Sequence, residues 1–187
     1  KQIRFCVPNG HIFLLILVGI ALLFIGVWNS FMRKKNRVHN ASASLDAILK
    51  KRYDLIPNLT EVVKGYAAYE QAVLESVLRV RNEALRARTI EEKEHADGKI
   101  AKGIEEIFVI AEKYPNLKAD RQFRFLQASL NEIEEQISAA RRAYNATVLE
   151  INTAIAVFPL NLFAKLYRIT AFPFFSATES EKRTPMV

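Results

Sequence analysis

The tetrapeptide Glu92-Lys93-Glu94-His95 is the stretch whose residue types and spacing come closest to a metal site. A carboxylate and an imidazole three residues apart on a helix carry the two-metal carboxylate sites of four-helix bundles. Such a site needs a second E-x-x-H and two further inward glutamates, and the sequence has no second copy. Thr89 and Glu92 instead match a T-x-x-E capping box at a helix start. We therefore expect neither a metal nor a cofactor here.

Other catalytic arrangements are missing from the sequence. It contains no Gly-rich phosphate loop, no G-x-S-x-G nucleophile motif and no H-E-x-x-H. His11 and His39 have no acidic or cysteine neighbours at ligand spacing. The single Cys6 excludes a disulfide framework and a multi-cysteine metal site. We predict that the protein is not an enzyme.

A long apolar segment lies near the N-terminal end of the chain. No residue from Phe5 to Met32 carries a formal charge when His11 is neutral. About 20 such residues cross a hydrocarbon layer of about 30 Å. No small-x-small cleavage site follows, which favours a retained anchor over a signal peptide. We predict a transmembrane helix over residues 10–32, preceded by a flank at residues 1–9.

Basic residues bracket this segment. Lys1 and Arg4 precede it, whereas an interfacial aromatic and four cations end it: Trp28, Arg33, Lys34, Lys35 and Arg37. Of the net charge of +7, only +1 belongs to the rest of the chain, with 21 basic and 20 acidic side chains. This pattern reports membrane topology and argues against a nucleic-acid partner. It predicts a cytoplasmic location for the following residues, although a leader before Lys1 would change the balance.

Apolar residues recur every three or four positions throughout residues 33–158, and no segment alternates with a period of two. Such spacing is typical of long helices that pack side by side in a bundle or coiled coil. The clearest stripe runs from Phe123 through Leu130, Ile137 and Tyr144 to Ile151. The sequence therefore predicts an all-α fold, in which the N-terminal transmembrane helix is followed by an up-and-down four-helix bundle with long helices.

Helix boundaries have local causes. Pro115 stops a helix at Tyr114, Asp120 caps the last long helix, and that helix ends before Pro159. The boundary at Pro57 is open to two interpretations. A turn there produces four helices, whereas a kink produces one very long helix and a three-helix arrangement. We favour the turn.

Polar residues interrupt the apolar stripes in two places. Arg52 and Glu70 are open to two interpretations. They form either a buried switch or a partner-docking pair, or else a partly exposed ion pair or an end-of-helix charge that extends into solvent. We favour the second interpretation. A second feature is a polar row with seven-residue spacing, which either sets the register between helices or is a solvated flank. We favour the flank for this row, which consists of Asn131, Ser138, Asn145 and Asn152.

The C-terminal segment 159–175 is apolar and basic with almost no other charge. It is either an interfacial membrane segment or a tail packed back on the bundle, and both interpretations carry equal weight. The candidate interfacial residues are Leu162, Phe163, Lys165, Leu166, Tyr167 and Arg168. Residues 176–187 are predicted to be a disordered tail.

Several blocks of the sequence resemble the LemA family. They run in order from about residue 36 to 167. They include Lys51 to Leu59, Ala111 to Ala119, and Phe158-Pro159 with Asn161-Leu162. The chain departs from the family pattern at Tyr69 and at Tyr167-Arg168. The most specific motif residues are Arg52, Asp54, Leu55, Ile56, Pro57, Asn58, Leu59, Gly65, Tyr66 and Glu70.

This resemblance implies a bacterial membrane protein with an N-terminal anchor and a four-helix bundle, and it implies no established enzymatic activity. We expect a single-pass protein of the bacterial inner membrane that acts as a scaffold. Membrane lipid, an unidentified protein partner and further copies of the chain in a homo-oligomer are the partners to consider. The alternative is a sensory or regulatory module coupled to a signalling partner in the membrane.

Overall fold

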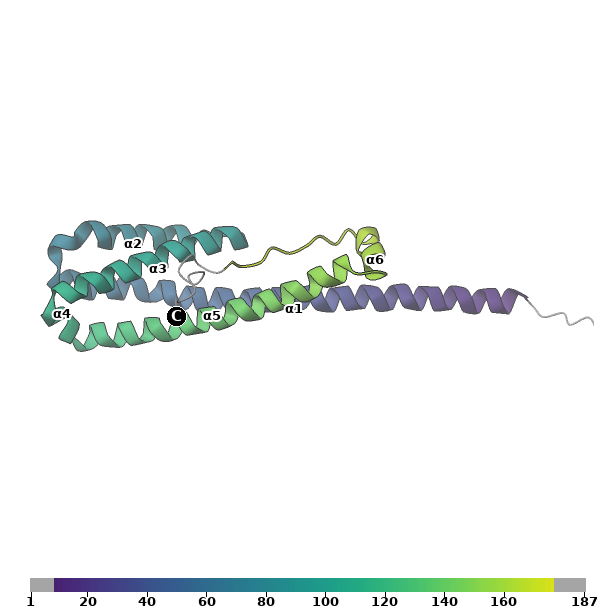
Figure 1. Cartoon of the computed structure of the whole chain (residues 1–187), viewed down its shortest axis with the longest axis horizontal. Coiled ribbons are helices and arrows are strands. Elements are labelled where there is room, and N and C mark those ends of the chain that lie inside the picture. The colour runs from purple at the N-terminus through teal and green to yellow at the C-terminus, as the bar shows by residue number, and fades with distance from the viewer. Residues whose placement is uncertain (1–8, 177–187) are drawn as a thin grey trace, which may run out of the picture.

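The computed structural model describes residues 9–176, and every regular element in that range is a helix (Figure 1). The all-α prediction and the long N-terminal apolar helix are thus confirmed. The predicted flank and the predicted disordered tail lie outside the described residues, apart from Asn9 and Ser176. The elements are α1 (Asn9–Tyr66), η1 (Ala68–Glu70), α2 (Gln71–Ala84), α3 (Ile90–Lys113), α4 (Pro115–Ala119), α5 (Arg121–Ala156) and α6 (Leu160–Leu166).

Helix α1 is 58 residues long and has two environments along its length. Its N-terminal part exposes apolar side chains in every direction from Ile12 to Ile25. Among the described residues, α1 alone is by itself long and apolar enough to span a membrane. The same helix then becomes the central element of the body of the protein, where Leu45, Ile56 and Val63 are fully buried.

The predicted turn at Pro57 is wrong, because α1 continues through this residue without a break. Proline has no N–H to donate to the carbonyl four residues earlier, here that of Tyr53. In the structure, Nε of Arg81 on α2 donates to that carbonyl oxygen at 3.0 Å. A tertiary hydrogen bond therefore replaces the helical one that Pro57 removes.

The chain reverses direction ten residues later, at Ala67 and η1, and α2 then runs back along α1. Helix α3 pairs with α2, and the two approach closely at Gly103, where a Cβ would lie 2.7 Å from Cγ2 of Val77. The predicted capping box is confirmed. The Thr89 hydroxyl accepts from the Glu92 N–H, and the Glu92 carboxylate accepts from the Thr89 N–H, both at 3.2 Å.

Helix α5 carries the chain back along the length of α1 (Figure 1). The predicted boundaries around its start are confirmed. Helix α3 ends before Tyr114, Pro115 opens α4, and the Asp120 carboxylate accepts from the N–H groups of Gln122 and Phe123. Helix α5 ends at Ala156, before Pro159 as predicted.

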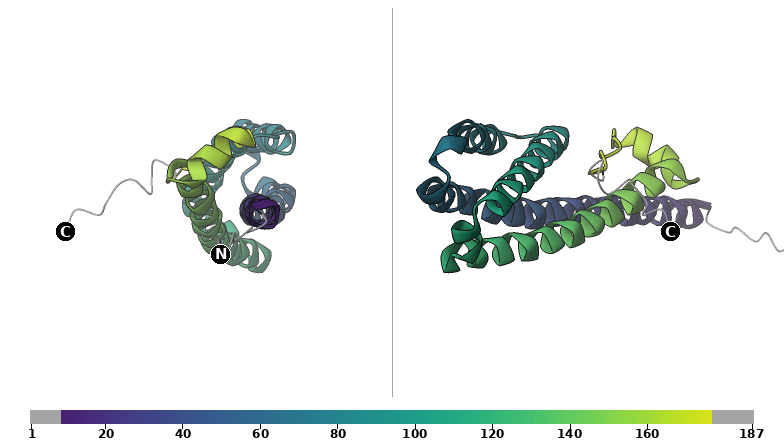
Figure 2. Two further views of the ribbon diagram at one scale, coloured as in Figure 1. Left: turned by 90° about the vertical axis from the view of Figure 1, so that its right-hand side faces the viewer. Right: turned by 60° about the vertical axis from the view of Figure 1, so that its left-hand side comes forward.

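Helices α1 and α5 extend past the end of the α2–α3 hairpin towards the apolar segment of α1 (Figure 1). Two helices alone cannot enclose the apolar seam between them, and the end of the chain covers this part of it. Helix α6 bends by 93° from α5 and crosses over its end (Figure 2). Arg168 then adopts a left-handed backbone (φ 53°), and residues 170–176 return along α5 without regular structure.

The Arg81 contact predicts a specific coupling with Pro57. Replacing Arg81 by Met leaves the buried Tyr53 carbonyl without a donor and should lower the free energy of unfolding by about 1–3 kcal/mol. In a Pro57→Ala background, the backbone N–H restored at this position can bond that carbonyl, so the same change should cost clearly less. Denaturant unfolding of the four variants in detergent, followed by circular dichroism, measures the coupling. Equal costs in the two backgrounds would contradict our explanation of the unbroken helix.

Candidate functional site

Helix α6 packs against the apolar segment of α1. The Phe163 ring meets Phe24 edge-to-face at 5.0 Å, and the Tyr167 ring meets Trp28 in the same way at 4.9 Å. The Tyr167 hydroxyl also donates to the Phe24 carbonyl at 3.1 Å. Edge-to-face aromatic pairs add specificity to apolar packing. These contacts place α6 beside the end of the predicted membrane-spanning helix.

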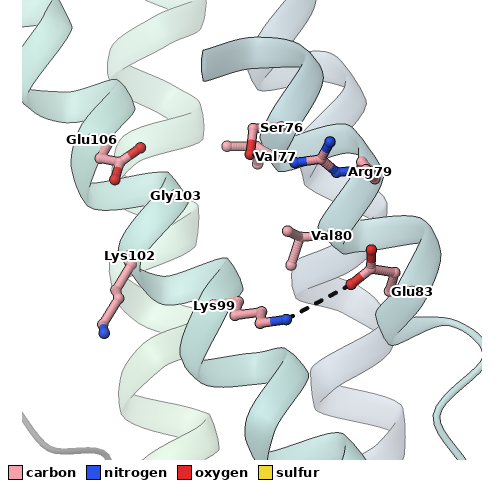
Figure 3. A pocket seen from close by; sticks show the side chains of 9 residues that line it. All are labelled: Ser76, Val77, Arg79, Val80, Glu83, Lys99, Lys102, Gly103 and Glu106. Carbon is pink, nitrogen blue, oxygen red and sulfur yellow. Dashed lines mark hydrogen bonds and ion pairs between the residues drawn. The ribbon is translucent and has the colours of Figure 1, made fainter. Parts of the chain in front are cut away.

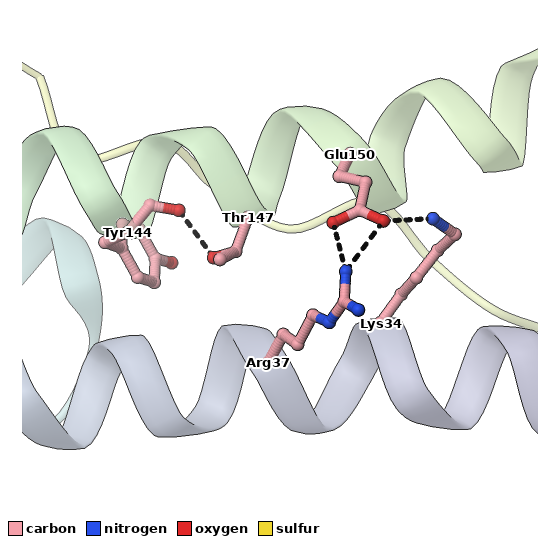
Figure 4. Close-up of polar contacts among 5 residues, drawn as sticks. All are labelled: Lys34, Arg37, Tyr144, Thr147 and Glu150. Carbon is pink, nitrogen blue, oxygen red and sulfur yellow. Dashed lines mark hydrogen bonds and ion pairs between the residues drawn. The ribbon is translucent and has the colours of Figure 1, made fainter.

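The basic cluster after the apolar segment divides into two pairs. Lys34 and Arg37 both bind Glu150 on α5 (Figure 4), and the Arg37 contacts measure 3.1 and 3.2 Å. These two cations lower the pKa of the Glu150 carboxyl, because each donates a hydrogen bond to its ionised form. Arg33 and Lys35 point to the exposed side of the helix. Two of the four cations in the predicted anchor flank therefore tie α5 to α1, and the other two are exposed to solvent.

The six candidate interfacial residues have different surroundings. Phe163 and Tyr167 are half-buried against α1, whereas 58% of Leu162 and 63% of Leu166 is exposed. Lys165 and Arg168 are exposed beside them. One face of α6 thus packs inwards, while the other presents apolar and basic groups together. That combination is characteristic of a helix lying in a membrane interface.

The residues after α6 do pack back on the helical body, as the competing interpretation predicts. Two amides of the polar row, Asn145 and Asn152, hold them, each with both an N–H and a C=O of the same tail residue. Asn145 pairs with Phe175 at 2.7 and 2.9 Å, and Asn152 pairs with Phe172 at 2.9 Å in both bonds. The solvated-flank interpretation is therefore wrong for these two asparagines.

Arg52 lies in a buried ionic cluster, so our preferred prediction of a partly exposed ion pair or a solvent-exposed end-of-helix charge is wrong for this residue. Glu70 is half-exposed at the end of η1. The Arg52 guanidinium contacts Asp97 of α3 at 2.9 Å and Glu134 of α5 at 2.7 Å, while only 4% of Arg52 is exposed. Asp97 is equally buried, and desolvation raises the pKa of its carboxyl despite the neighbouring cation. The cluster joins α1, α3 and α5 through one side chain.

The sequence analysis missed Asp97 and Arg141, although a signal for both was present. Asp97 lies three residues before Ile100 and seven before Ile104, in phase with the apolar stripe of α3. Arg141 stands in the same way between Ile137 and Tyr144 on α5, where its guanidinium lies 5.9 Å from the centre of the Phe175 ring. A charge in phase with an apolar stripe is buried when the stripe is buried, and it then requires partners.

Half of the ten motif residues that carry the family resemblance have structural contacts, and Arg52, described above, is one of them. Ile56 and Leu59 are fully buried in the core, and Leu55 packs against it. The Tyr66 hydroxyl donates to the Asp120 carboxylate at 3.0 Å and so links the end of α1 to the cap of α5. The remaining motif residues lie at the surface or at its edge: Asp54, Pro57, Asn58, Gly65 and Glu70.

The E-x-x-H stretch does not assemble a metal site in this part of the chain. Glu92 accepts hydrogen bonds from the backbone N–H groups of Arg88 and Thr89, which lower the pKa of its carboxyl. His95 is exposed, and Glu94 accepts from the Ser176 N–H at 3.2 Å. Residues 9–176 contain no group of three or more side chains able to share a metal ion.

Several surface clefts lie in grooves between helices. The one between α2 and α3 measures about 320 Å³ and is lined by charges of both signs around Gly103, with Lys99 4.0 Å from Glu83 (Figure 3). Lys102 and Glu106 occupy the α3 side, and Arg79 occupies the α2 side. The charges in this groove belong to the solvated faces of the two helices and form no converging set of catalytic groups.

These features define a class of protein: an all-helical body built on one long helix whose first part can span a membrane. Comparison with known proteins identifies the family. The LemA family model matches residues 41–187, and the chain belongs to the LemA family.

Individual relatives are distant but cover most of the chain. Protein LemA of Metamycoplasma hominis is 25% identical over 177 residues, which cover 91% of this chain and 79% of that protein. Magnetosome protein MamQ of Magnetospirillum gryphiswaldense is 20% identical over 176 residues, covering 80% of this chain and 65% of its own length. Magnetosome protein MamQ 2 of Paramagnetospirillum magneticum is 21% identical over 184 residues, with 82% and 68% covered.

The buried cluster predicts a pH-dependent stability defect. Arg52→Met leaves Asp97 buried without its cation and should cost about 3–5 kcal/mol of unfolding free energy near neutral pH. The pKa of the Asp97 carboxyl is higher in the folded state than its value of about 3.9 in the unfolded state. The folded protein therefore loses stability as the pH rises from the unfolded-state pKa through the folded-state pKa. Removing Arg52 raises the folded-state pKa of Asp97 further, because Arg52 favours the ionised carboxylate. The loss of unfolding free energy should therefore be larger at about pH 8 than at about pH 5.

Chemical unfolding of the detergent-solubilised protein at both pH values measures this effect. The control is Arg52→Met combined with Asp97→Asn, which should recover stability and lose the added pH dependence. A defect of the same size at both pH values would contradict the assignment to Asp97.

Proposed function

We propose that this chain is a non-enzymatic scaffold, anchored by one transmembrane helix in the bacterial inner membrane, that presents a helical bundle for binding other proteins. The observation that carries the proposal is the continuity of α1, which is both the membrane-length apolar helix and the centre of the body. From Arg33 to Tyr66 this helix rises about 50 Å. It holds the far end of the body at a constant distance from the membrane.

The bundle in this proposal is an up-and-down arrangement of α1 after Met32, α2, α3 and α5. The apolar periodicity of these helices supports it, as does a shared core to which all four contribute. Arg33 and Lys35 support a cytoplasmic location, because exposed cations next to a spanning segment favour that side. Homo-oligomers are compatible with the same arrangement.

The far end of the body carries the exposed apolar groups that a protein partner would use. Tyr69 of η1 is almost fully exposed, and 68% of Phe125 at the start of α5 is exposed. Val109 and Tyr66 lie within a few turns of the same end and are also exposed. Exposed aromatics gathered away from the membrane are typical of protein interfaces.

Crosslinking in intact cells tests the scaffold and its orientation together. A membrane-permeable crosslinker should capture a stable partner on the wild-type chain, whereas an impermeant reagent should capture none. Tyr69→Ser with Phe125→Ser should reduce capture about tenfold or more, since central aromatic contacts contribute about 2 kcal/mol or more. Leu149→Ser, at an apolar residue elsewhere on α5 that is 59% exposed, is the matched control.

Two results would contradict the proposal. If no partner is captured, the proposed scaffold function is wrong. If the impermeant reagent captures a partner, the proposed cytoplasmic orientation is wrong. The alternative, a regulatory module, is favoured by the same unbroken helix, which connects the membrane to the far end of the body. It predicts capture that depends on a stimulus instead of a constant partner.

We further propose that α6 makes a second, peripheral contact with the membrane. Phe163 and Tyr167 hold α6 at the level of Phe24 and Trp28, where the apolar segment of α1 ends. The outward Leu162 and Leu166 would then enter the interface, and Lys165 would meet anionic headgroups.

Depth-dependent fluorescence quenching tests this contact in the full chain. With Cys6 changed to Ser, a fluorophore on Leu166→Cys should be quenched by nitroxide lipids in anionic vesicles. The same fluorophore on Phe125→Cys, where exposure is similar, should not respond, because that residue lies about 50 Å away along the body. Equal responses at the two positions would show that α6 does not touch lipid.

A further inference from the structure

The groove that holds the end of the chain is built to bind the backbone of an extended peptide. Asn145 and Asn152 each use both atoms of the side-chain amide to exchange two hydrogen bonds with one residue of the tail. The Tyr144 hydroxyl adds a bond to the Pro173 carbonyl at 2.9 Å, and Glu94 on α3 accepts from the Ser176 N–H. All six of these bonds involve the tail's backbone.

A match in length explains why two asparagines suffice. Seven residues of α-helix rise about 10.5 Å, and three residues of extended chain cover about 10 Å. Asn145 and Asn152 are seven apart on α5, and their partners Phe175 and Phe172 are three apart in the tail. The helix therefore presents amides at the repeat of an extended strand and in the opposite chain direction, as a neighbouring β-strand would.

Selectivity in this groove comes from aromatic side chains. Only 1% of Phe175 is exposed, and its ring lies under the Arg141 guanidinium, while Phe172 is half-buried against the core. Phe174, between them, faces solvent. The groove thus selects an extended segment with two aromatic residues three positions apart.

We infer that this tail (residues 171–176) exchanges between copies of the chain, so that one copy's tail occupies the α3–α5 groove of a neighbour. A second copy carries the aromatic pair and proline that the groove already accommodates. The inference rests on the proposed membrane anchor, which would insert a second copy in the same membrane with the same orientation and depth. The tail of one copy therefore leaves its α6 at the height of the neighbour's groove.

Exchange has a low free-energy cost for a membrane-bound protein. The contacts made in the neighbour's groove are identical to those made within one chain, so exchange costs association and linker entropy and sacrifices no contact. Opening requires the loss of a short segment held by side chains, and it leaves the α1–α5 packing intact. The six residues from Leu166 to Phe172 reach about 20 Å when extended. Confinement in one membrane raises the local concentration of acceptor grooves.

The test places one cysteine on each of two different full-length chains. Both carry Cys6→Ser; the donor also has Ser176→Cys, and the acceptor has Glu94→Cys, next to the observed position of Ser176. After reconstitution of both chains into the same vesicles, a short bismaleimide should link donor to acceptor. The yield of this heterodimer should rise with the number of chains per vesicle.

Variants of the groove and of the tail establish where the link forms. Asn145→Ala with Asn152→Ala in the acceptor should lower the heterodimer yield about tenfold or more, because four hydrogen bonds are lost. Phe175→Ser in the donor should have the same effect without altering the acceptor. Asn131→Ala, exposed in the same polar row, is the matched control and should leave the yield unchanged.

A single chain carrying both cysteines reports the position of the tail within one copy. If no heterodimer forms at any number of chains per vesicle, while the chain with both cysteines crosslinks internally, the tail does not exchange. Heterodimer that persists in both the asparagine and the phenylalanine variants would place the contact elsewhere. A two-cysteine chain that fails to link in either way would contradict the groove itself.

Discussion

The structure depends on α1 remaining one helix from its apolar N-terminal segment to Tyr66. Its weakest point is Pro57, where the helix loses a backbone hydrogen bond and the Tyr53 carbonyl has no local donor. Arg81 supplies that donor from α2, and so the packing of α2 on α1 is also what completes α1. Because the hydrogen bond from Arg81 completes α1, the body and the apolar segment of α1 remain on one continuous helix.

The second constraint is the difference in length between the helices. Helices α1 and α5 run beyond the α2–α3 hairpin, and the apolar seam between them would face water there. Helix α6 and the tail cover this stretch by different means. Helix α6 packs two aromatic rings against Phe24 and Trp28. The tail packs Phe172 and Phe175 against the core, and side chains of α5 hydrogen-bond to the backbone of these two residues. The end of the chain therefore covers the α1–α5 seam near the apolar segment of α1, as the α2–α3 hairpin covers it at the far end of the body.

Charged residues of the same type take different roles according to their environment. Lys34 and Arg37 form ion pairs with Glu150 and so link α1 to α5, whereas Arg33 and Lys35 are exposed to solvent. Arg52 is buried between two carboxylates that come from different helices. Such a cluster adds little net stability compared with apolar packing, but it disfavours any register that would leave one of its charges alone. It is therefore better understood as a determinant of how α1, α3 and α5 align than as a site for chemistry.

The sequence alone determined the features whose causes are local. The apolarity of the first segment, the capping box at Thr89, the stop at Pro115 and the cap at Asp120 all depend on residues that are close to one another in the chain. The periodicity of the apolar stripes likewise determined that the fold is all-α. These features were predicted correctly because backbone geometry and side-chain spacing are sufficient to specify them.

Only the tertiary structure decided what depends on partners distant in the chain. Pro57 by itself favours a helix start, and Arg81, 24 residues later, removes that preference. In the sequence, Asn145 and Asn152 look like part of a solvated row, but in the structure they bind the backbone of the tail. Arg52 likewise looks like a surface charge, but in the structure it pairs with Asp97 and Glu134. In each case an unsatisfied polar group in one segment is completed by another segment, and no local pattern records which segment that will be.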